Sequence, residues 1–444
     1  MMNLTQLLQK DQQYIWHPGT QMKDLAETPP LVVHEAKGSY LYTDRGPIID
    51  ALSSWWCKSL GHRHPAVIDA IQAQLGRFEH VIGANTTHPN LVQLGEKLAQ
   101  MTGNPHVFFA SDGSSAVEIA MKLALHAAQL KGEPQRREWI ALQNGYHGET
   151  FGALTVSDLS LYKKPYQSLE APCHFLRDLP YLNTVTDPAW SNIDDQWLQL
   201  LQQLEPFKST ACALILEPII QGAGGMRCYG PALLEKLATW TQQNGIYLIA
   251  DEIMTGCGRT GKWLASDHAG IQADLICLSK GLTSGTLPLS CVSVSQSLYD
   301  LFYDDYLTGK SFLHSHTYSG HALAAAAAVA TLDVMANENI LEQAQKIGQH
   351  MYRSLSKIAA TTGCLTGVRS VGAMVAADFV NVDNPYPSRL GYQFYKEALK
   401  RGALLRPLGN TLYWLPPLNT SLDTLDHLAE ITLESIKALY RGEN

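Results

Sequence analysis

Residues Asp274 to Gly281 read DLICLSKG, and the predicted fold is built outward from this stretch. The apolar run Leu275 to Leu278 predicts a buried strand, and Lys280 follows its carboxyl end, where α/β sheets place their chemistry. A lysine with a buried stem and an amine facing a cleft has a lowered pKa, so it can attack a carbonyl group and form a Schiff base. The alternative is a solvated lysine that ends a strand.

A second apolar strand, IYLIA from Ile246 to Ala250, is followed directly by Asp251. Parallel strands end at the same edge of a sheet, so Asp251 and Lys280 would meet there. Pyridoxal phosphate needs such a pair, because a lysine holds its aldehyde carbon and a carboxylate keeps its ring nitrogen protonated. The alternative is a plain salt bridge, but a buried pair of that kind is weak evidence for stability.

The composition is that of an ordinary globular enzyme. At 444 residues the chain is long enough for two lobes, and 45% of its residues are hydrophobic. The formal net charge of −8 gives no indication of a nucleic-acid partner, and we expect none.

The eight cysteines contain no C-x-x-C pair, so we expect no metal site and a reducing, cytoplasmic location. The first residues, MMNLTQLLQKDQQY, predict a short amphipathic helix rather than a secretory signal. The run Ala322 to Ala330 is far shorter than the roughly 18 apolar residues of a membrane span. We therefore expect no membrane association.

A phosphate site is predicted where a strand at residues 107–111 leads through Asp112-Gly113-Ser114-Ser115 into a helix over residues 116–130. Free backbone N–H groups and the helix dipole at such a start favour an anion. The alternative is an ordinary serine cap. In combination with Lys280 and Asp251, this turn would anchor the cofactor.

A further strand over residues 211–216 ends at Glu217, which we expect to support the site through hydrogen bonds. The following QGAGG, residues 221–225, suggests a dinucleotide fingerprint. That motif needs a third glycine where Arg227 stands and a location near the N-terminus, so we reject a nicotinamide dehydrogenase.

Two longer stretches resemble a known family. IADEIMTGCGRTGK (249–262), followed by DLICLSKGLTSGTLPLS (274–290), is similar to the class III, fold-type I pyridoxal-phosphate aminotransferases. Within that family, four more stretches resemble the branch that transfers the amino group of S-adenosylmethionine to 8-amino-7-oxononanoate in biotin biosynthesis. They are IWHPGTQMKD (15–24), ALSSWWCKSLGHRHP (51–65), NGYHGETFGALTVSD (144–158) and LRPLGNTLYWLPP (405–417).

The resemblance implies an α/β architecture with pyridoxal 5'-phosphate as cofactor. A large domain, residues 53–334, would hold a mixed, mostly parallel sheet flanked by helices. A smaller α/β domain would combine residues 1–52 with residues 335–444. The family also implies a homodimer with its site at the subunit interface.

The resemblance also assigns roles to individual residues. Catalysis would fall to Lys280, Asp251 and Tyr146, with Tyr146 stacked on the pyridine ring. Cofactor binding would involve Gly113, Ser114, Tyr146, Asp251, Lys280, His316 and Thr317, with Thr317 reaching the phosphate of the neighbouring subunit. Substrate binding would involve Trp55, Tyr146, Arg259, Lys280, Ser315 and Arg406.

Four of the substrate residues have an ordinary alternative role. Trp55 can be core, since indole area is mostly used in packing. Tyr146 can be a tyrosine packed in a loop, and Arg259 a surface charge. Arg406 can form a surface ion pair, although its planar guanidinium group is also suited to bind a substrate carboxylate through two parallel hydrogen bonds.

The sequence departs from the biotin branch at two places. Gly19 stands where the family commonly has an aromatic residue, and residues 314–317 read HSHT instead of a glycine-containing turn. A general ω-amino acid:pyruvate aminotransferase therefore remains an alternative. A catalytically inactive ligand-binding homologue is a third hypothesis, and the Lys280 and Asp251 pair argues against it.

Overall fold

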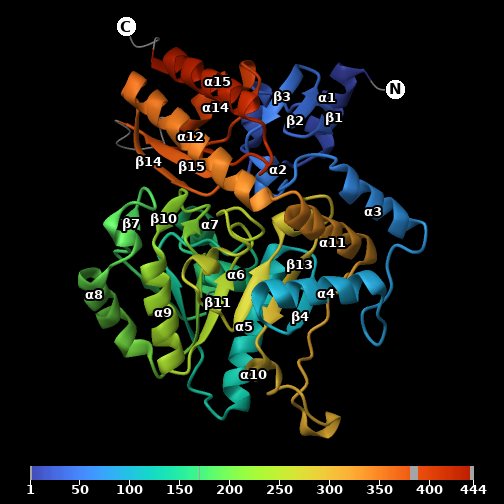
Figure 1. Ribbon diagram of the computed structural model, residues 1–444, viewed down its shortest axis with the longest axis vertical. Helices are drawn as coiled ribbons and strands as arrows, with labels where there is room; N and C mark the ends of the chain where they lie inside the picture. The colour runs from blue at the N-terminus through green and yellow to red at the C-terminus, as the bar shows by residue number, and fades with distance from the viewer. Residues whose placement is uncertain (1–2, 170, 381–388, 441–444) are drawn as a thin grey trace.

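The computed structural model describes residues 3–169, 171–380 and 389–440. Elements from both ends of the chain lie together above a large sheet and its helices (Figure 1). The two ends are joined by a parallel pairing in which Ala403 and Leu404 of β16 lie opposite Ile49 and Asp50 of β3.

The large sheet has seven strands in the order β4-β13-β12-β11-β8-β5-β6. Its neighbours from β12 to β6 pair in parallel, whereas β13 is antiparallel to both β12 and β4. The strands are β4 (His106–Ala110), β5 (Glu138–Leu142), β6 (Cys173–Leu176), β8 (Ala211–Leu216), β11 (Tyr247–Asp251), β12 (Leu275–Leu278) and β13 (Ser290–Val294).

Every residue of β8, β11 and β12 is buried, as expected for parallel strands covered on both faces. Helix α5 (Gly113–Leu130) packs against β13, β12 and β8, and α9 (Pro231–Gln243) packs against β11. Helices therefore pack on these strands, and Asp251 lies at the carboxyl end of β11.

Three smaller sheets surround the large one. The first has the order β1-β2-β3-β16, the second β14-β15-β17 and the third β7-β10-β9. Their strands are β1 (Val33–Lys37), β2 (Tyr40–Thr43), β3 (Gly46–Asp50), β7 (Tyr181–Leu182), β9 (Ile220–Gln221), β10 (Arg227–Tyr229), β14 (Leu365–Val371), β15 (Met374–Phe379), β16 (Ala403–Leu404) and β17 (Thr411–Trp414).

The C-terminal helices show how amphipathic patterning positions an element. Helix α12 buries Ile340, Ala344, Ile347, Met351 and Leu355 at helical spacing, and this face packs on β14, β15 and α15. The other helices are α1 (Leu4–Tyr14), α2 (Ser53–Trp56), α3 (Pro65–Leu75), α4 (Pro89–Thr102), α6 (Phe151–Thr155), α7 (Ser160–Lys163), α8 (Asp194–Leu204), α10 (Gln296–Tyr299), α11 (Ala322–Asn337), α12 (Ile340–Thr362), α14 (Leu390–Lys400) and α15 (Leu422–Tyr440).

Short 3-10 helices complete the chain: η1 (Met22–Ala26), η2 (Lys164–Leu169), η3 (Pro188–Trp190), η4 (Glu205–Phe207), η5 (Ala265–His268), η6 (Lys280–Thr283) and η7 (Tyr306–Thr308).

The strands predicted at residues 107–111 and 246–250 are each shifted by one residue, and the predicted start of helix α5 was wrong. Helix α5 begins at Gly113 rather than at residue 116, because Asp112 caps it: its Oδ1 accepts a hydrogen bond from the Ser115 N–H at 2.9 Å. Gly113 and Ser114 thus lie in the first helical turn. The predicted domain boundaries at residues 52 and 334 stay predictions.

All eight cysteines are free thiols. None of the described helices combines the length and the apolar character that crossing a membrane would require. Among the described residues there is also no cluster of three His, Cys, Asp or Glu side chains suited to a metal ion.

Candidate active site

Lys280 lies just beyond the end of β12, as the first residue of η6, with a φ of +41°. Its Nζ is 4.9 Å from the centroid of the Trp56 ring. Burial lowers the pKa of the Lys280 amine, and the nearby Asp251, Glu217 and Cys57 act in the opposite direction. A lysine whose pKa is lowered in this way has more of the neutral amine that attacks a carbonyl group.

Asp251 is the last residue of β11 and pairs with Cys277 of the parallel strand β12. The two strands thus end at one edge, as predicted. Only 4% of Asp251 is exposed. Its Oδ2 is 2.7 Å from His147 Nδ1, and its Oδ1 accepts the Ile253 N–H at 3.1 Å. The carboxylate is held in one orientation close to Lys280.

His147 contacts Asp251 and is a candidate site residue that sequence reasoning missed. Its side chain is buried, and within the described residues its Nε2 has no hydrogen-bond partner. Its backbone N–H donates to Ser157 Oγ at 2.9 Å. Its position next to Tyr146, in a loop already assigned to the site, could have marked it as a candidate. No local sequence pattern relates it to Asp251, which is 104 positions away.

Glu217 makes the supporting hydrogen bonds that the sequence predicted. Its Oε2 accepts the Tyr146 N–H and its Oε1 accepts the Gly222 N–H, both at 2.9 Å. Burial raises the pKa of Glu217 to about 7, with Asp251 acting in the same direction and His147 opposing it. A buried carboxyl group therefore fixes the loop that carries Tyr146.

The ring of Tyr146 is half-buried, and its hydroxyl donates to Glu149 Oε1 at 2.9 Å. Burial raises the pKa of the Tyr146 hydroxyl above its ordinary value, and Glu149 adds to the shift. The phenol is therefore neutral at physiological pH. Its stacking on a pyridine ring stays a prediction.

The start of α5 has the geometry that the predicted phosphate site requires. The first N–H groups of a helix have no partner inside it, and the helix dipole makes this end attractive to a phosphate. Gly148, with a φ of +124°, packs so closely on this turn that an added Cβ would lie 2.1 Å from Ser114 Oγ. The loop that carries Tyr146 and His147 therefore packs directly against Ser114.

The segment around residues 314–317 lies beside this turn. His316 Nε2 is 3.0 Å from Ser111 Oγ, two residues before Gly113. Thr317 and Ser315 are exposed, and the Thr317 carbonyl lies 3.0 Å from His80 Nε2. Their predicted contacts with cofactor and substrate stay predictions, as does the reach of Thr317 into a neighbouring subunit.

Trp55 and Arg406 lie together. Trp55 is 54% exposed, so the alternative that it is a core residue is wrong. The Arg406 guanidinium carbon is 5.5 Å from the centroid of the Trp55 ring. Arg406 Nη2 donates to the backbone carbonyl of Gly19. An added Cβ at Gly19 would lie 3.4 Å from the Trp55 ring, so the departure at Gly19 adjoins both residues.

Arg259 is 3% exposed, so the interpretation as a surface charge is wrong. Its Nη1 donates to the carbonyls of Ala373 at 3.0 Å and Pro416 at 2.8 Å. Burial lowers the pKa of Arg259 to about 9. Its predicted contact with the substrate stays a prediction.

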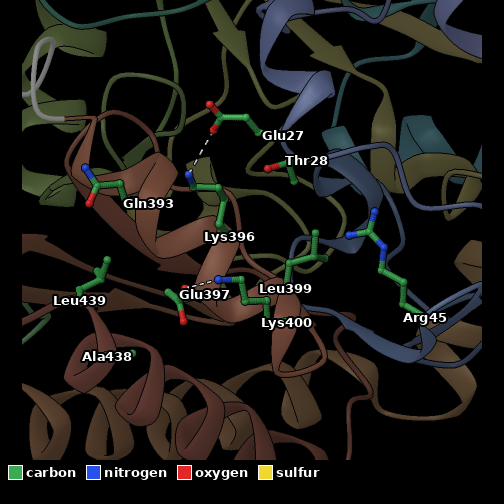
Figure 2. Close-up of a pocket in the computed structure, with 10 residues that line it drawn as sticks. All are labelled: Glu27, Thr28, Arg45, Gln393, Lys396, Glu397, Leu399, Lys400, Ala438 and Leu439. Carbon is green, nitrogen blue, oxygen red and sulfur yellow. Dashed lines mark hydrogen bonds and ion pairs between the residues drawn. The ribbon is translucent and has the colours of Figure 1, made fainter. Parts of the chain in front are cut away.

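A separate pocket of about 540 Å³, drawn in Figure 2, contains none of the predicted site residues. Within it Lys396 lies 3.7 Å from Glu27 and Lys400 lies 2.6 Å from Glu397. These charges pair with one another, so we assign this pocket no part in the chemistry.

Comparison with known proteins identifies the family. The family model for aminotransferase class-III matches residues 22–436. The adenosylmethionine-8-amino-7-oxononanoate aminotransferase of Helicobacter pylori is 36% identical, over 97% of this chain and 98% of the relative.

Solved structures agree with this match. The crystal structure of adenosylmethionine-8-amino-7-oxononanoate aminotransferase from Methanocaldococcus jannaschii superimposes with a TM-score of 0.91, at 31% identity, covering 98% of this chain and 99% of that one. A PLP-bound amine transaminase from an uncultivated Pseudomonas species gives a TM-score of 0.86 at 31% identity, covering 96% and 98%. The predicted α/β, fold-type I architecture is confirmed. The chain belongs to the class III aminotransferase family.

Proposed function

We propose that this protein is a pyridoxal-phosphate enzyme that transfers the amino group of S-adenosylmethionine to 8-amino-7-oxononanoate, giving 7,8-diaminononanoate in biotin biosynthesis. The names of the Helicobacter and Methanocaldococcus relatives support this choice of substrates. The observation that carries it is the Lys280 amine, whose pKa is lowered by burial, at the strand edge that it shares with Asp251.

The residues present fit pyridoxal phosphate. Lys280 offers a nucleophilic amine, Asp251 a buried carboxylate, and the first turn of α5 a cradle for the phosphate at Gly113 and Ser114. When bound, the cofactor supplies an electron sink for cleavage of bonds at the amino-bearing carbon.

The side chains have separate tasks. Lys280 would hold the cofactor and, once the donor amine has displaced it, would act as a free amine that accepts a proton from the amino-bearing carbon of the substrate. Asp251 would keep a proton on the ring nitrogen, and the His147 hydrogen bond maintains the orientation of its carboxylate. Tyr146 would stack on the ring, and Glu217 holds the loop that carries it.

The substrate lies against an aromatic wall. Trp55 and Tyr146 contact the aliphatic chain of the acceptor, and their ring faces attract the sulfonium of the donor. One N–H group of Arg406 donates to the Gly19 carbonyl, and the other N–H groups of its guanidinium bind the acceptor carboxylate. Arg259, near the donor, and Ser315 would complete the set of substrate-binding side chains.

We further propose a homodimer in the cytoplasm. The loops around His316 and Thr317 carry exposed apolar side chains, including Leu307 at 94% and Leu313 at 89% exposure, which a second copy would cover. The eight free thiols suit a reducing compartment. Light scattering coupled to size exclusion tests the dimer, and a monomer at micromolar concentration would exclude it.

The test is a half-reaction. Purified protein loaded with pyridoxal phosphate is mixed with S-adenosylmethionine alone, and its visible absorbance is followed. Loss of the absorbance, and its recovery on adding 8-amino-7-oxononanoate, is the expected result. No change with S-adenosylmethionine would exclude it as donor.

A general ω-amino acid:pyruvate aminotransferase is the second candidate. The glycine beside Trp55 and Arg406, in place of an aromatic residue, favours it, as does the likeness to the Pseudomonas amine transaminase. Loss of absorbance with alanine or β-alanine, but not with S-adenosylmethionine, would select this candidate. Protein that stays colourless with added cofactor would instead indicate an inactive homologue.

A further inference from the structure

The segment Ser53–Trp56 is a turn of left-handed backbone without glycine. The φ angles of its four residues are +49°, +45°, +71° and +73°. The left-handed region brings Cβ too close to the following carbonyl oxygen, so residues with side chains avoid it, and successive ones are rarer still. Strained segments of this kind persist where the surroundings fix them, and they cluster at functional sites.

The turn sends two adjacent tryptophans to different places. Trp56 is 5% exposed, its Nε1 donates to the Tyr413 hydroxyl at 3.1 Å, and its ring faces Lys280 Nζ at 4.9 Å. Trp55 is 54% exposed and lies against Arg406. One short turn therefore touches both the amine and the guanidinium of the proposed site.

Asp50 holds the turn in this conformation. It is fully buried; its Oδ1 accepts the Ser54 N–H at 3.0 Å, and its Oδ2 accepts the Ser54 hydroxyl at 2.7 Å. His62 Nε2 lies 2.8 Å from the same Oδ2. Burial acts to raise the pKa of Asp50, but the hydrogen bonds from His62 and Ser54 outweigh it and the pKa is lowered. The carboxylate stays charged inside the protein.

Both ends of the turn are fixed as well. The Ser53 hydroxyl donates to the Leu415 carbonyl at 2.7 Å, which ties the turn to the segment after β17. The Trp56 N–H donates to the Leu52 carbonyl at 2.8 Å. These bonds leave the turn little freedom once Asp50 is in place.

We propose that Asp50 is a positioning residue for the reaction. By holding the left-handed turn, it places Trp56 against Lys280 and Trp55 against Arg406, and so sets the spacing between the reacting amine and the group that binds the substrate carboxylate. The inference rests on the proposed function, in which Lys280 attaches the cofactor and Arg406 binds that carboxylate.

Two measurements report on the two sides of the turn. The ratio of kcat/KM for 8-amino-7-oxononanoate to that for its methyl ester reports on Arg406, because the ester lacks the carboxylate charge. The pH dependence of Lys280 acetylation by acetic anhydride, measured by peptide mass spectrometry on protein without cofactor, reports on the amine.

Asp50→Asn should change both measurements. We expect the acid-to-ester ratio to fall by about tenfold, the usual effect of losing a charge-assisted hydrogen bond. The acetylation midpoint of Lys280 should rise, because water reaches the amine when Trp56 moves. Trp55→Ala should change only the ratio, and Trp56→Ala only the acetylation. The matched control is Asp426→Asn, which removes the carboxylate from a surface pair of Asp426 and His350. It should change neither the acid-to-ester ratio nor the acetylation midpoint.

The outcomes separate the two levels of inference. A wild-type protein without preference for the acid refutes the role of Arg406, and the proposal for Asp50 with it. A wild-type preference that persists in Asp50→Asn, with unchanged acetylation, overturns the proposal alone. If Asp50→Asn does not fold, Ser54→Ala decides, since it removes one hydroxyl from the network: smaller shifts in both measurements support the proposal, and unchanged values overturn it.

Discussion

Glu217 makes the folding stability depend on pH. Its pKa in the folded chain is about 7, against an ordinary value of 4.5, chiefly because it is buried. Between these two pH values the folded chain keeps a proton that the unfolded chain releases. The contribution of Glu217 to the free energy of unfolding therefore falls as pH rises from 4.5 to 7, and it no longer changes above that range.

The size of the effect follows from the two pKa values. Each tenfold step in a proton dissociation constant corresponds to about 1.36 kcal/mol, so Glu217 removes about 3 kcal/mol between pH 4 and pH 8. In Glu217→Gln this dependence should vanish. The amide nitrogen cannot accept a hydrogen bond, so either the Tyr146 or the Gly222 N–H loses its acceptor, at a pH-independent cost of about 1–3 kcal/mol.

The assay is urea denaturation of cofactor-free protein at several pH values, followed by tryptophan fluorescence. We expect Glu217→Gln to be less stable than wild type at pH 4 and at least as stable at pH 8. The exposed Glu430→Gln on α15 is the control and should parallel wild type. A difference between Glu217→Gln and wild type that stays constant with pH would refute the reasoning. The infrared band of a protonated carboxyl group, lost in Glu217→Gln, is an independent measurement.

Three further predictions concern single contacts. Gly148→Ala should weaken binding of pyridoxal phosphate, because the new Cβ would lie 2.1 Å from Ser114 Oγ at the start of α5. A fluorescence titration with the cofactor measures this affinity, and an affinity equal to that of wild type would contradict the proposed phosphate site. Arg259→Met should lower the free energy of unfolding by about 2–6 kcal/mol, since two buried carbonyls lose their donor; an unchanged urea midpoint would argue against this. Lys280→Ala should abolish transamination and prevent borohydride from fixing the cofactor to the protein, which peptide mass spectrometry detects; cofactor fixed at another lysine would exclude the assignment.

The local pattern of the chain was enough to predict the sheet edge. The apolar runs before Asp251 and after Asp274 are short and uninterrupted, which is the pattern of parallel strands buried on both faces. The sequence therefore predicted that a carboxylate and an amine would meet. It also predicted the support from Glu217, although not that this support reaches the backbone of Tyr146.

The tertiary structure decided the contacts between distant residues. His147 lies 104 positions from Asp251, and Gly19 lies 387 from Arg406, so no local period relates the partners. The left-handed turn at Ser53–Trp56 was equally hidden, because its residues do not favour that backbone and contacts with distant residues, with Asp50 at their centre, hold them there. Periodicity describes which face of an element is buried; which side chains meet across elements depends on how the packed elements bring them together.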